Sequence, residues 1–233
     1  AGGNNSALAH AAGELILLMN QDVIVHFNCL EEFITAFKKS PQAGVVSANM
    51  FMISAKDRPD RYAPSPATVG HYQLSPFGYA AYVVREANSE MMPVEFISGN
   101  GMCFQKKLLA DVGNYLFDDR LKSYAEDLDF CIRLKETKWG LYVRPSAVIY
   151  HYRDEAFSGH PLVRVKKFVH ISTNRLLVYH KNLLLGRFCV KLPLILLGIS
   201  LKVARPDGAS KFHLVNFCVA LLLTPVVLTN FYL

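Results

Sequence analysis

Short apolar runs alternate with amphipathic segments along the first two-thirds of the chain. Brief continuous runs are typical of buried strands in a parallel sheet, and apolar residues at three- to four-residue spacing indicate helices. Leu30, Phe33, Ile34 and Phe37, for example, would share one face of a helix. The pattern predicts strands at 14–19, 45–52, 94–97, 102–104, 141–143 and 147–150, and helices at 6–13, 30–39, 106–112 and 126–138. It therefore predicts an α/β fold with a mostly parallel sheet flanked by helices.

Two parts of the chain depart from this alternation. Residues 54–90 hold several prolines and glycines with tyrosines between them, which predicts a long loop containing one short element at most. Loops of that length in compact domains usually bind ligands or act as lids. At the other end, 155–182 is predicted to form a basic amphipathic helical arm. The expected domains are thus a catalytic-type α/β domain over 1–154, this arm, and a C-terminal part over 183–233.

The C-terminal part carries the strongest hydrophobic signal. Residues 212–233 contain no Lys, Arg, Asp or Glu, and about 20 apolar residues suffice to span a bilayer. Residues 183–204 are apolar but include three cations, which favours an interfacial helix. The cations between the two stretches favour the cytoplasmic face of the cell membrane. A buried helical hairpin is the alternative interpretation.

Charge and cysteine content narrow the choice of partners. Residues 1–150 hold 14 Lys/Arg and 16 Asp/Glu, whereas 151–233 hold 11 and 3. A basic, apolar C-terminal part favours a membrane surface over nucleic acid as partner, since no nucleic-acid-binding motif accompanies the cations. The chain has five cysteines, none spaced as a metal clip, which argues against a disulfide framework or a zinc site and fits a reducing compartment.

Polar residues follow the first predicted strand. Asn20, Gln21 and Asp22 come directly after the run ending at Met19, and open α/β sheets bind ligands at the carboxyl ends of their strands. A carboxylate there could hold Mg²⁺ or Mn²⁺ together with a diphosphate. Asp22 could equally cap the following turn.

Three acids open the helix predicted at 126–138. Glu126, Asp127 and Asp129 lie within four residues. Such acids can simply stabilise the positive end of the helix dipole, and Asp129 or Glu126 could pair with Arg133 one turn later. Crowded carboxylates also give a general base a raised pKa.

Two smaller features complete the candidate chemistry. The turn Ser98-Gly99-Asn100-Gly101 permits a close approach of backbone to ligand, or is an ordinary tight turn. His151 ends the strand predicted at 147–150, a position comparable with that of Asp22, although a lone histidine is more often structural.

The order of these motifs resembles that of family-2 glycosyltransferases. GGNNSALAHAAGELILLMNQD is similar to the family's loop, helix, strand and DxD-like motif. The stretch from Ile97 to His151 is similar to its second signature, with an SG turn, a helix ending in VG, an ED.D...R helix and a P.A...H strand. The resemblance covers about 1–182 and is nearest to rhamnosyltransferase-like members that assemble bacterial cell-surface polysaccharide, and the QxxRW motif of processive synthases is missing.

The resemblance implies a GT-A fold and an inverting, metal-dependent transferase of hexosyltransferase type, with a nucleotide-sugar donor and a glycan or lipid-linked acceptor. Asp127 would be the catalytic base with Glu126 beside it, and Asp22 and His151 would bind Mg²⁺ or Mn²⁺. The substrate-binding residues would be Asn4, Asn20, Ser98, Gly99, Asn100 and Arg133.

Two departures from the family pattern matter. Asn20 stands where the family has the first acid of its metal motif, and the family's N-terminal nucleotide-binding segment would precede residue 1, so the chain is interpreted as a fragment with weak donor binding of its own. Asn20 also supports the alternative of a non-catalytic, membrane-anchored scaffold with a degenerate transferase fold.

Overall fold

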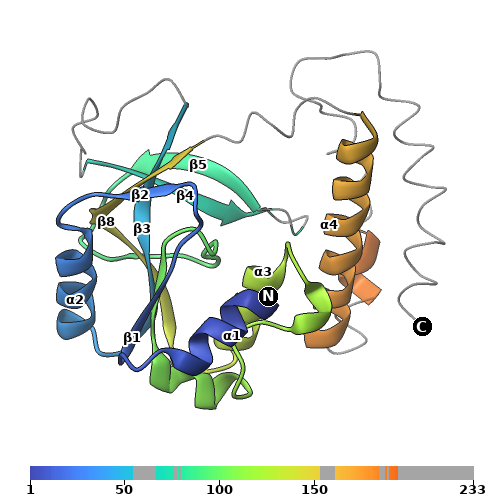
Figure 1. Ribbon diagram of the computed structural model, residues 1–233, viewed down its shortest axis with the longest axis horizontal. Helices are drawn as coiled ribbons and strands as arrows, with labels where there is room; N and C mark the ends of the chain where they lie inside the picture. Colours follow the sequence, from blue (N-terminus) through green and yellow to red (C-terminus); the bar gives the residue numbers. More distant parts are fainter. Residues whose placement is uncertain are drawn as a thin grey trace. The chain divides into compact units, whose positions relative to one another are not determined.

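The computed structural model describes residues 1–54, 67–75, 78, 80–152, 161–183, 187 and 189–193 (Figure 1). The chain divides into two compact units. One comprises Ala1–Gln73 with Ala80–Glu155, and the other comprises Leu74–Tyr79 with Ala156–Leu233. The two units are described separately below.

The first unit is built on a mixed sheet. Its strands are β1 (Leu15–Leu18), β2 (Val23–Val25), β3 (Ala43–Ile53), β6 (Met92–Pro93), β7 (Met102–Gln105) and β8 (Gly140–Tyr152). The order is β1-β7-β3-β8-β2, with β6 also paired to β8. Only the β3–β8 pair is parallel. The predicted mostly parallel sheet is therefore wrong, because β7 and β2 insert as antiparallel neighbours, which need no helical crossover.

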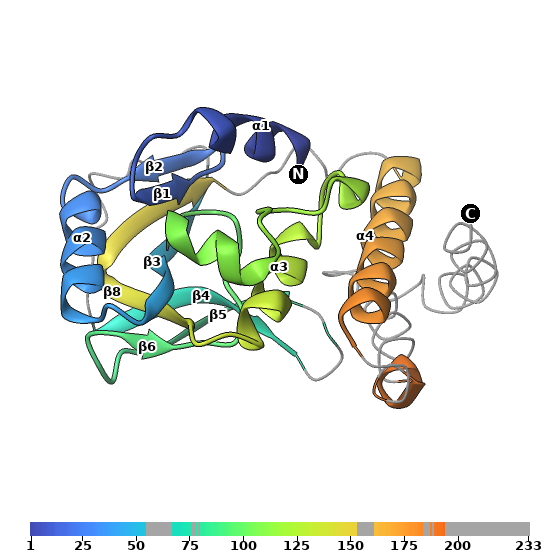
Figure 2. The same ribbon diagram turned by 90° about the horizontal axis from the view of Figure 1, so that it is seen from below.

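Helices cover both faces of this sheet (Figures 1 and 2). On one face, α2 (Cys29–Lys39) buries Phe33 and Phe37 in a cluster that includes Met50 of β3 and Ile149 of β8. On the other, α3 (Glu126–Lys135) presents Phe130 to Phe104 of β7, with ring centroids 5.9 Å apart.

The buried face of α2 differs in part from the predicted one. Leu30 and Ile34 are 56% and 46% exposed, while Cys29 and Ala36 are fully buried with Phe33 and Phe37. The spacing of apolar residues located this helix correctly. Packing against the sheet sets the rotation of α2 about its own axis, so that the side with Cys29 and Ala36 is buried and the side with Leu30 and Ile34 is exposed.

Several element boundaries also shift. The first helix is α1 (Gly2–His10) and has no buried residue, and Lys106–Val112 forms the 3₁₀ helix η2, followed by a shorter one, η3 (Asp119–Leu121). Residues 94–97 form no strand. The strands predicted at 141–143 and 147–150 are one strand, β8, whose register against β3 shifts around Pro145, a residue that cannot donate to a strand ladder.

The largest correction concerns the predicted loop at 54–90. Its described part contains two strands that follow each other in the chain, β4 (Thr68–Leu74) and β5 (Ala80–Glu86). These two strands pair with each other in a two-stranded sheet. Asn49 of β3 ties this sheet to the main one, because its Oδ1 accepts from the Gly70 N–H at 2.9 Å and its Nδ2 donates to the Thr68 carbonyl at 2.8 Å. Residues 55–66 lie outside the described part.

The second unit contains α4 (Pro161–Asn182), which agrees with most of the arm predicted at 155–182. No helix among the described residues is long and apolar enough to cross a membrane. The span predicted at 212–233, and most of the segment 183–204, lie outside the described residues.

We expect Gly101→Ala to destabilise the protein by about 1–3 kcal/mol, because a non-glycine residue is strained at positive φ. Gly101 has φ +87°, and a Cβ there would lie 2.4 Å from Ile149 Cδ1. The control is Gly99→Ala, since a Cβ at Gly99 would meet nothing within 4 Å. Thermal unfolding of both variants checks this, and equal melting temperatures would contradict it.

Candidate active site

The site begins where β1 ends. The Gly101 N–H donates to the Leu18 carbonyl at 3.0 Å, so the turn at 98–101 lies beside the polar residues that follow β1. Asn20 Nδ2 donates to Asn100 Oδ1 across this junction. Two of the predicted substrate-binding residues, far apart in sequence, are therefore in direct contact.

Pairing of β2 with β8 brings Asp22 to His151. Val23 lies opposite His151 in the antiparallel register, and the Tyr152 N–H donates to the Asp22 carbonyl at 3.0 Å. Asp22 Oδ1 lies 3.4 Å from His151 Nε2. Asn100 Nδ2 lies 3.3 Å from the same Nε2, which joins Asn20, Asn100, His151 and Asp22 into one cluster.

This cluster fits a divalent cation shared with a substrate. Asp22 Oδ1 is buried yet accepts no hydrogen bond, and a buried carboxylate oxygen without a donor is unfavourable unless a cation or ligand completes it. Asn100 Oδ1 accepts from Asn20, so the Asn100 amide N–H₂ faces His151 Nε2. Within the described residues no set of three His, Cys, Asp or Glu side chains is arranged around a metal position. Further ligands would come from substrate oxygens and water.

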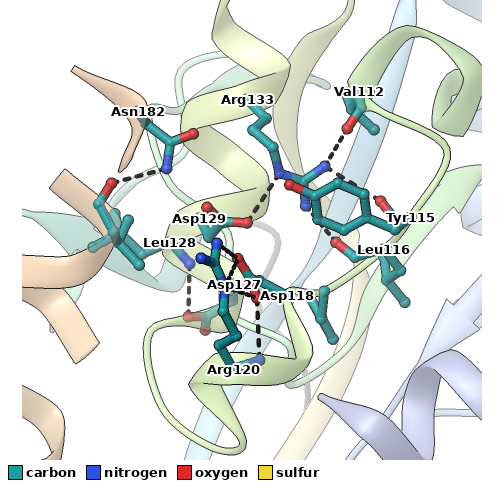
Figure 3. A network of polar contacts seen from close by, with 12 residues as sticks. Val112, Tyr115, Leu116, Asp118, Arg120, Asp127, Leu128, Asp129, Arg133 and Asn182 are labelled. Carbon is teal, nitrogen blue, oxygen red and sulfur yellow. Dashed lines mark hydrogen bonds and ion pairs between the residues drawn. The ribbon is translucent and has the colours of Figure 1, made fainter. Parts of the chain in front are cut away.

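Asp127 lies at the first turn of α3, opposite the 98–101 turn. Its Oδ1 accepts from the Leu128 N–H at 2.8 Å, drawn in Figure 3, and its Oδ2 accepts from the Gly99 N–H at 3.3 Å. Burial, and then the charge of Glu126, raise the pKa of Asp127 to about 6, although the two N–H donors oppose the rise. A carboxylate with this pKa is ionised at neutral pH and still basic enough to take a proton.

The backbone leading into α3 is strained. Lys122, Tyr124 and Ala125 have φ of 55°, 68° and 68°, a region that side-chain-bearing residues rarely adopt. Ala125 is the N-cap and offers no capping side chain. Such strain is concentrated at functional sites, where the surrounding structure holds it. Here the strained residues directly precede α3 and fix the orientation of its first two residues, Glu126 and Asp127.

Arg133 pairs with Asp129, one of the two partners expected for it from the sequence. It forms a buried ion pair with Asp129 at 2.9 Å and donates to the carbonyls of Val112, Tyr115 and Leu116 (Figure 3). Its guanidinium also stacks over the Tyr115 ring at 4.1 Å. Arg133 thus closes the segment before α3.

The remaining predicted residues are less informative. Ser98 is half-buried in the turn beside Gly99, and Glu126 is half-buried with an unpartnered Oε2. Asn4 is exposed on α1. Its neighbour Asn5 makes the structural contacts there, donating to the Phe117 carbonyl and accepting from its N–H.

Tyr72 lies on β4, within the stretch that the sequence predicted to be a loop. Burial raises the pKa of the Tyr72 hydroxyl, and the negative charges of Asp127 and then Asp22 raise it further. The run TVGHYQL at 68–74 is rich in β-branched and aromatic residues, which was the available signal for a strand.

Comparison with known structures shows the fold. The structure of GalNAc-T7 with UDP, GalNAc and Mn²⁺ matches with a TM-score of 0.60 at 13% identity, over 99% of this chain and 44% of that one. The mannosyltransferase PcManGT from Pyrobaculum calidifontis, in complex with GDP-Man and Mn²⁺, gives 0.44 at 15% identity, over 98% and 61%. S. aureus TarS gives 0.45 at 17% identity, over 87% and 33%. The chain thus spans less than two-thirds of each of these proteins.

Comparison with curated protein sequences gave no match. The sequence pattern of the family described as "Glycosyl transferase family group 2" matches residues 15–233. This range includes Asn20 and Asp22, the 98–101 turn, Asp127 and His151. The fold is GT-A-like, and the chain belongs to glycosyl transferase family group 2.

Proposed function

We propose that the protein is an inverting glycosyltransferase of hexosyltransferase type, which moves a sugar from a nucleotide-diphosphate sugar to an acceptor hydroxyl. The observation that carries the proposal is Asp127. Its pKa is raised to about 6, Gly99 orients it, and the same turn also holds the Asp22–His151 cluster through Asn100. A base and a diphosphate-binding cluster on one turn are the two parts that inverting transfer requires.

In this reaction Asp127 removes the proton of the acceptor hydroxyl. The acceptor oxygen forms a bond to the anomeric carbon as the bond from that carbon to the phosphate oxygen breaks, so the nucleoside diphosphate leaves with the electron pair. One base suffices, since no side chain forms a covalent bond to the sugar. The Gly99 N–H donates to Asp127 Oδ2 and holds this carboxylate beside the 98–101 turn.

Asp22 and His151 would hold Mg²⁺ or Mn²⁺. The ion would offset the negative charge that develops on the leaving diphosphate. GalNAc-T7, the structure with the same fold, was solved with UDP and Mn²⁺, which supports a nucleotide-sugar donor and a divalent ion here. Asn20 and Asn100, joined to each other, would line the donor side, and Ser98 with Gly99 the sugar side.

We propose further that the protein acts at the cytoplasmic face of the cell membrane, on a glycan or lipid-linked acceptor of cell-surface polysaccharide assembly. This rests on the basic excess of 151–233 and the uncharged run 212–233. Equal activity on soluble acceptors in the presence and in the absence of membranes would contradict this proposal.

A second candidate is a non-catalytic scaffold that retains the transferase fold. Asn20 favours it, because a carboxylate at that position would have given the cluster a second anionic ligand and the amide is instead bonded to Asn100. The scaffold predicts no metal-dependent turnover of any donor, and the first experiment below separates the two.

We expect the full-length protein in membranes to release nucleoside diphosphate from one nucleotide sugar of a panel when Mg²⁺ or Mn²⁺ is present. Asp127→Asn should lower this rate at least about 100-fold, the usual effect of losing a general base. The control is Glu95→Gln, an exposed acid whose side chain is 76% accessible. Equal activity of Asp127→Asn and wild type would exclude Asp127 as the base.

The pH profile should show an acid limb near pH 6. Asp127 acts as a base only when ionised, so kcat/KM should fall about tenfold per pH unit below its pKa of about 6. Glu126→Gln should move this limb to lower pH, because the charge of Glu126 raises the pKa of Asp127. A limb near pH 4 that Glu126→Gln leaves in place would contradict the assignment.

Removal of either proposed metal ligand should raise the metal requirement. Asp22→Asn and His151→Ala should each increase the Mn²⁺ concentration for half-maximal activity by about tenfold or more, the order seen when a metal site loses a supporting group. His10→Ala, at the end of α1, is the control. Full activity of both variants in EDTA would show that Asp22 and His151 bind no essential ion.

A further inference from the structure

The first helix, α1, lies between the two sides of the candidate site. None of its residues is buried, so buried apolar packing does not fix its position. Its half-buried Asn5 reaches the segment that leads to Asp127. Just beyond its last turn, the Ala11 carbonyl accepts from Lys106 Nζ at 2.6 Å, and the chain continues into β1, which ends at the Asp22 side of the site. Polar contacts at both ends therefore hold α1 in place.

Asn5 forms three hydrogen bonds with the segment 117–119. Its Nδ2 donates to the Phe117 carbonyl at 2.8 Å, and its Oδ1 accepts from the Phe117 N–H at 3.1 Å. The amide side chain thus binds both backbone groups of one residue, as a paired residue of an antiparallel strand would. Nδ2 also donates to Asp119 Oδ1 at 2.8 Å. These bonds need a side chain that donates and accepts at once, which an amide does.

Phe117 connects Asn5 to α3. The Phe117 side chain is buried, and its ring packs edge-on against Phe130 of α3, with centroids 6.2 Å apart and planes at 87°. Phe130 lies about one turn after Asp127 on the same helix. It also packs against Phe104 of β7, at 5.9 Å between centroids. The residue whose backbone Asn5 binds is therefore in contact with the helix that bears the proposed base.

The same segment runs directly into the first turn of α3. It passes through η3, whose Leu121 is buried, and then through three residues at positive φ within 122–125. A strained backbone persists only where its surroundings hold it. Arg133 binds carbonyls in the earlier part of the segment, as far as Leu116 (Figure 3). Asn5 binds the part that follows, next to the strained residues.

We propose that Asn5 is a positioning residue for the general base, which fixes the segment 117–125 and thereby the orientation of Asp127, acting through Phe117 and not through contact with substrate. This inference rests on the proposed function, in which Asp127 removes the acceptor proton. Asp127 Oδ2 accepts from the Gly99 N–H at 3.3 Å, so a shift of the helix start would misalign the base. A misplacement of about 1 Å can lower a rate about 100-fold.

The test separates turnover from binding in the full-length protein. Asn5→Ala should lower kcat for nucleoside diphosphate release about tenfold or more. Affinity for UDP, GDP or dTDP with Mn²⁺ should stay within about twofold of wild type, because the proposed diphosphate site at Asp22 is held by the pairing of β2 with β8. Asn5→Asp, which keeps an acceptor but loses both donors, should act in the same way. The control is Ser6→Ala, an exposed neighbour on α1.

The pH profile of Asn5→Ala gives a second measurement. Burial is the largest cause of the raised pKa of Asp127, about 6. A loosened helix start would admit water, lower this pKa and move the acid limb of kcat/KM toward pH 4, about the pKa of an exposed Asp. A fall in kcat with the acid limb unmoved would overturn the role of Asn5.

The other outcomes separate this inference from the proposed function. Wild-type kcat in Asn5→Ala would overturn the role of Asn5 and leave the transferase in place. Equal loss of kcat and diphosphate affinity, or unfolding of both Asn5 variants, would assign Asn5 to the fold alone and would also overturn its role. A wild type that releases no nucleoside diphosphate from any donor would overturn the proposed function and the inference together.

Discussion

The parallel pairing of β3 with β8 is the constraint on which the rest of the structure depends. It runs from Ala43 opposite Gly140 to Ile53 opposite Tyr152. Each part of the site is attached to this pair. β2 joins β8 and brings Asp22 to His151, and the Ala48 N–H donates to the Gly101 carbonyl at 3.3 Å. The register shift near Pro145 matters for the same reason, because it sets which β8 side chains reach the sheet end where His151 lies.

Within α3 two neighbouring acids, Asp127 and Asp129, have separate environments. Asp129 is fully buried and is neutralised by Arg133, which also closes the preceding segment through three carbonyls. Asp127 has no cation of its own among its described contacts and is held by two backbone N–H groups. A buried ion pair needs both partners to be tolerated, whereas a carboxylate held only by amides can still exchange a proton. The helix therefore separates a structural acid from a titrating one within half a turn.

Local pattern predicted most single elements but not their arrangement. The continuous apolar runs at Leu15–Leu18 and Ala43–Ile53, and the helical spacing of apolar residues in Cys29–Lys39, identify their elements. Strand direction is set by partners remote in sequence, and so the strand predicted at 102–104 was located correctly while its antiparallel direction was missed. The role of Arg133 depends on carbonyls 17 to 21 residues away. Positions at the ends of predicted strands and at the start of a predicted helix singled out Asp22, His151 and Asp127, and the resemblance assigned their roles. The structure adds that Asn100 and Gly99 connect them.

The β4–β5 hairpin shows why a pair of strands can escape sequence reasoning. Gly70 would be taken as a break in a strand, yet it is required because a Cβ there would lie 2.1 Å from the Met50 carbonyl and from the Tyr82 hydroxyl. The glycine thus permits the hairpin to lie close against β3.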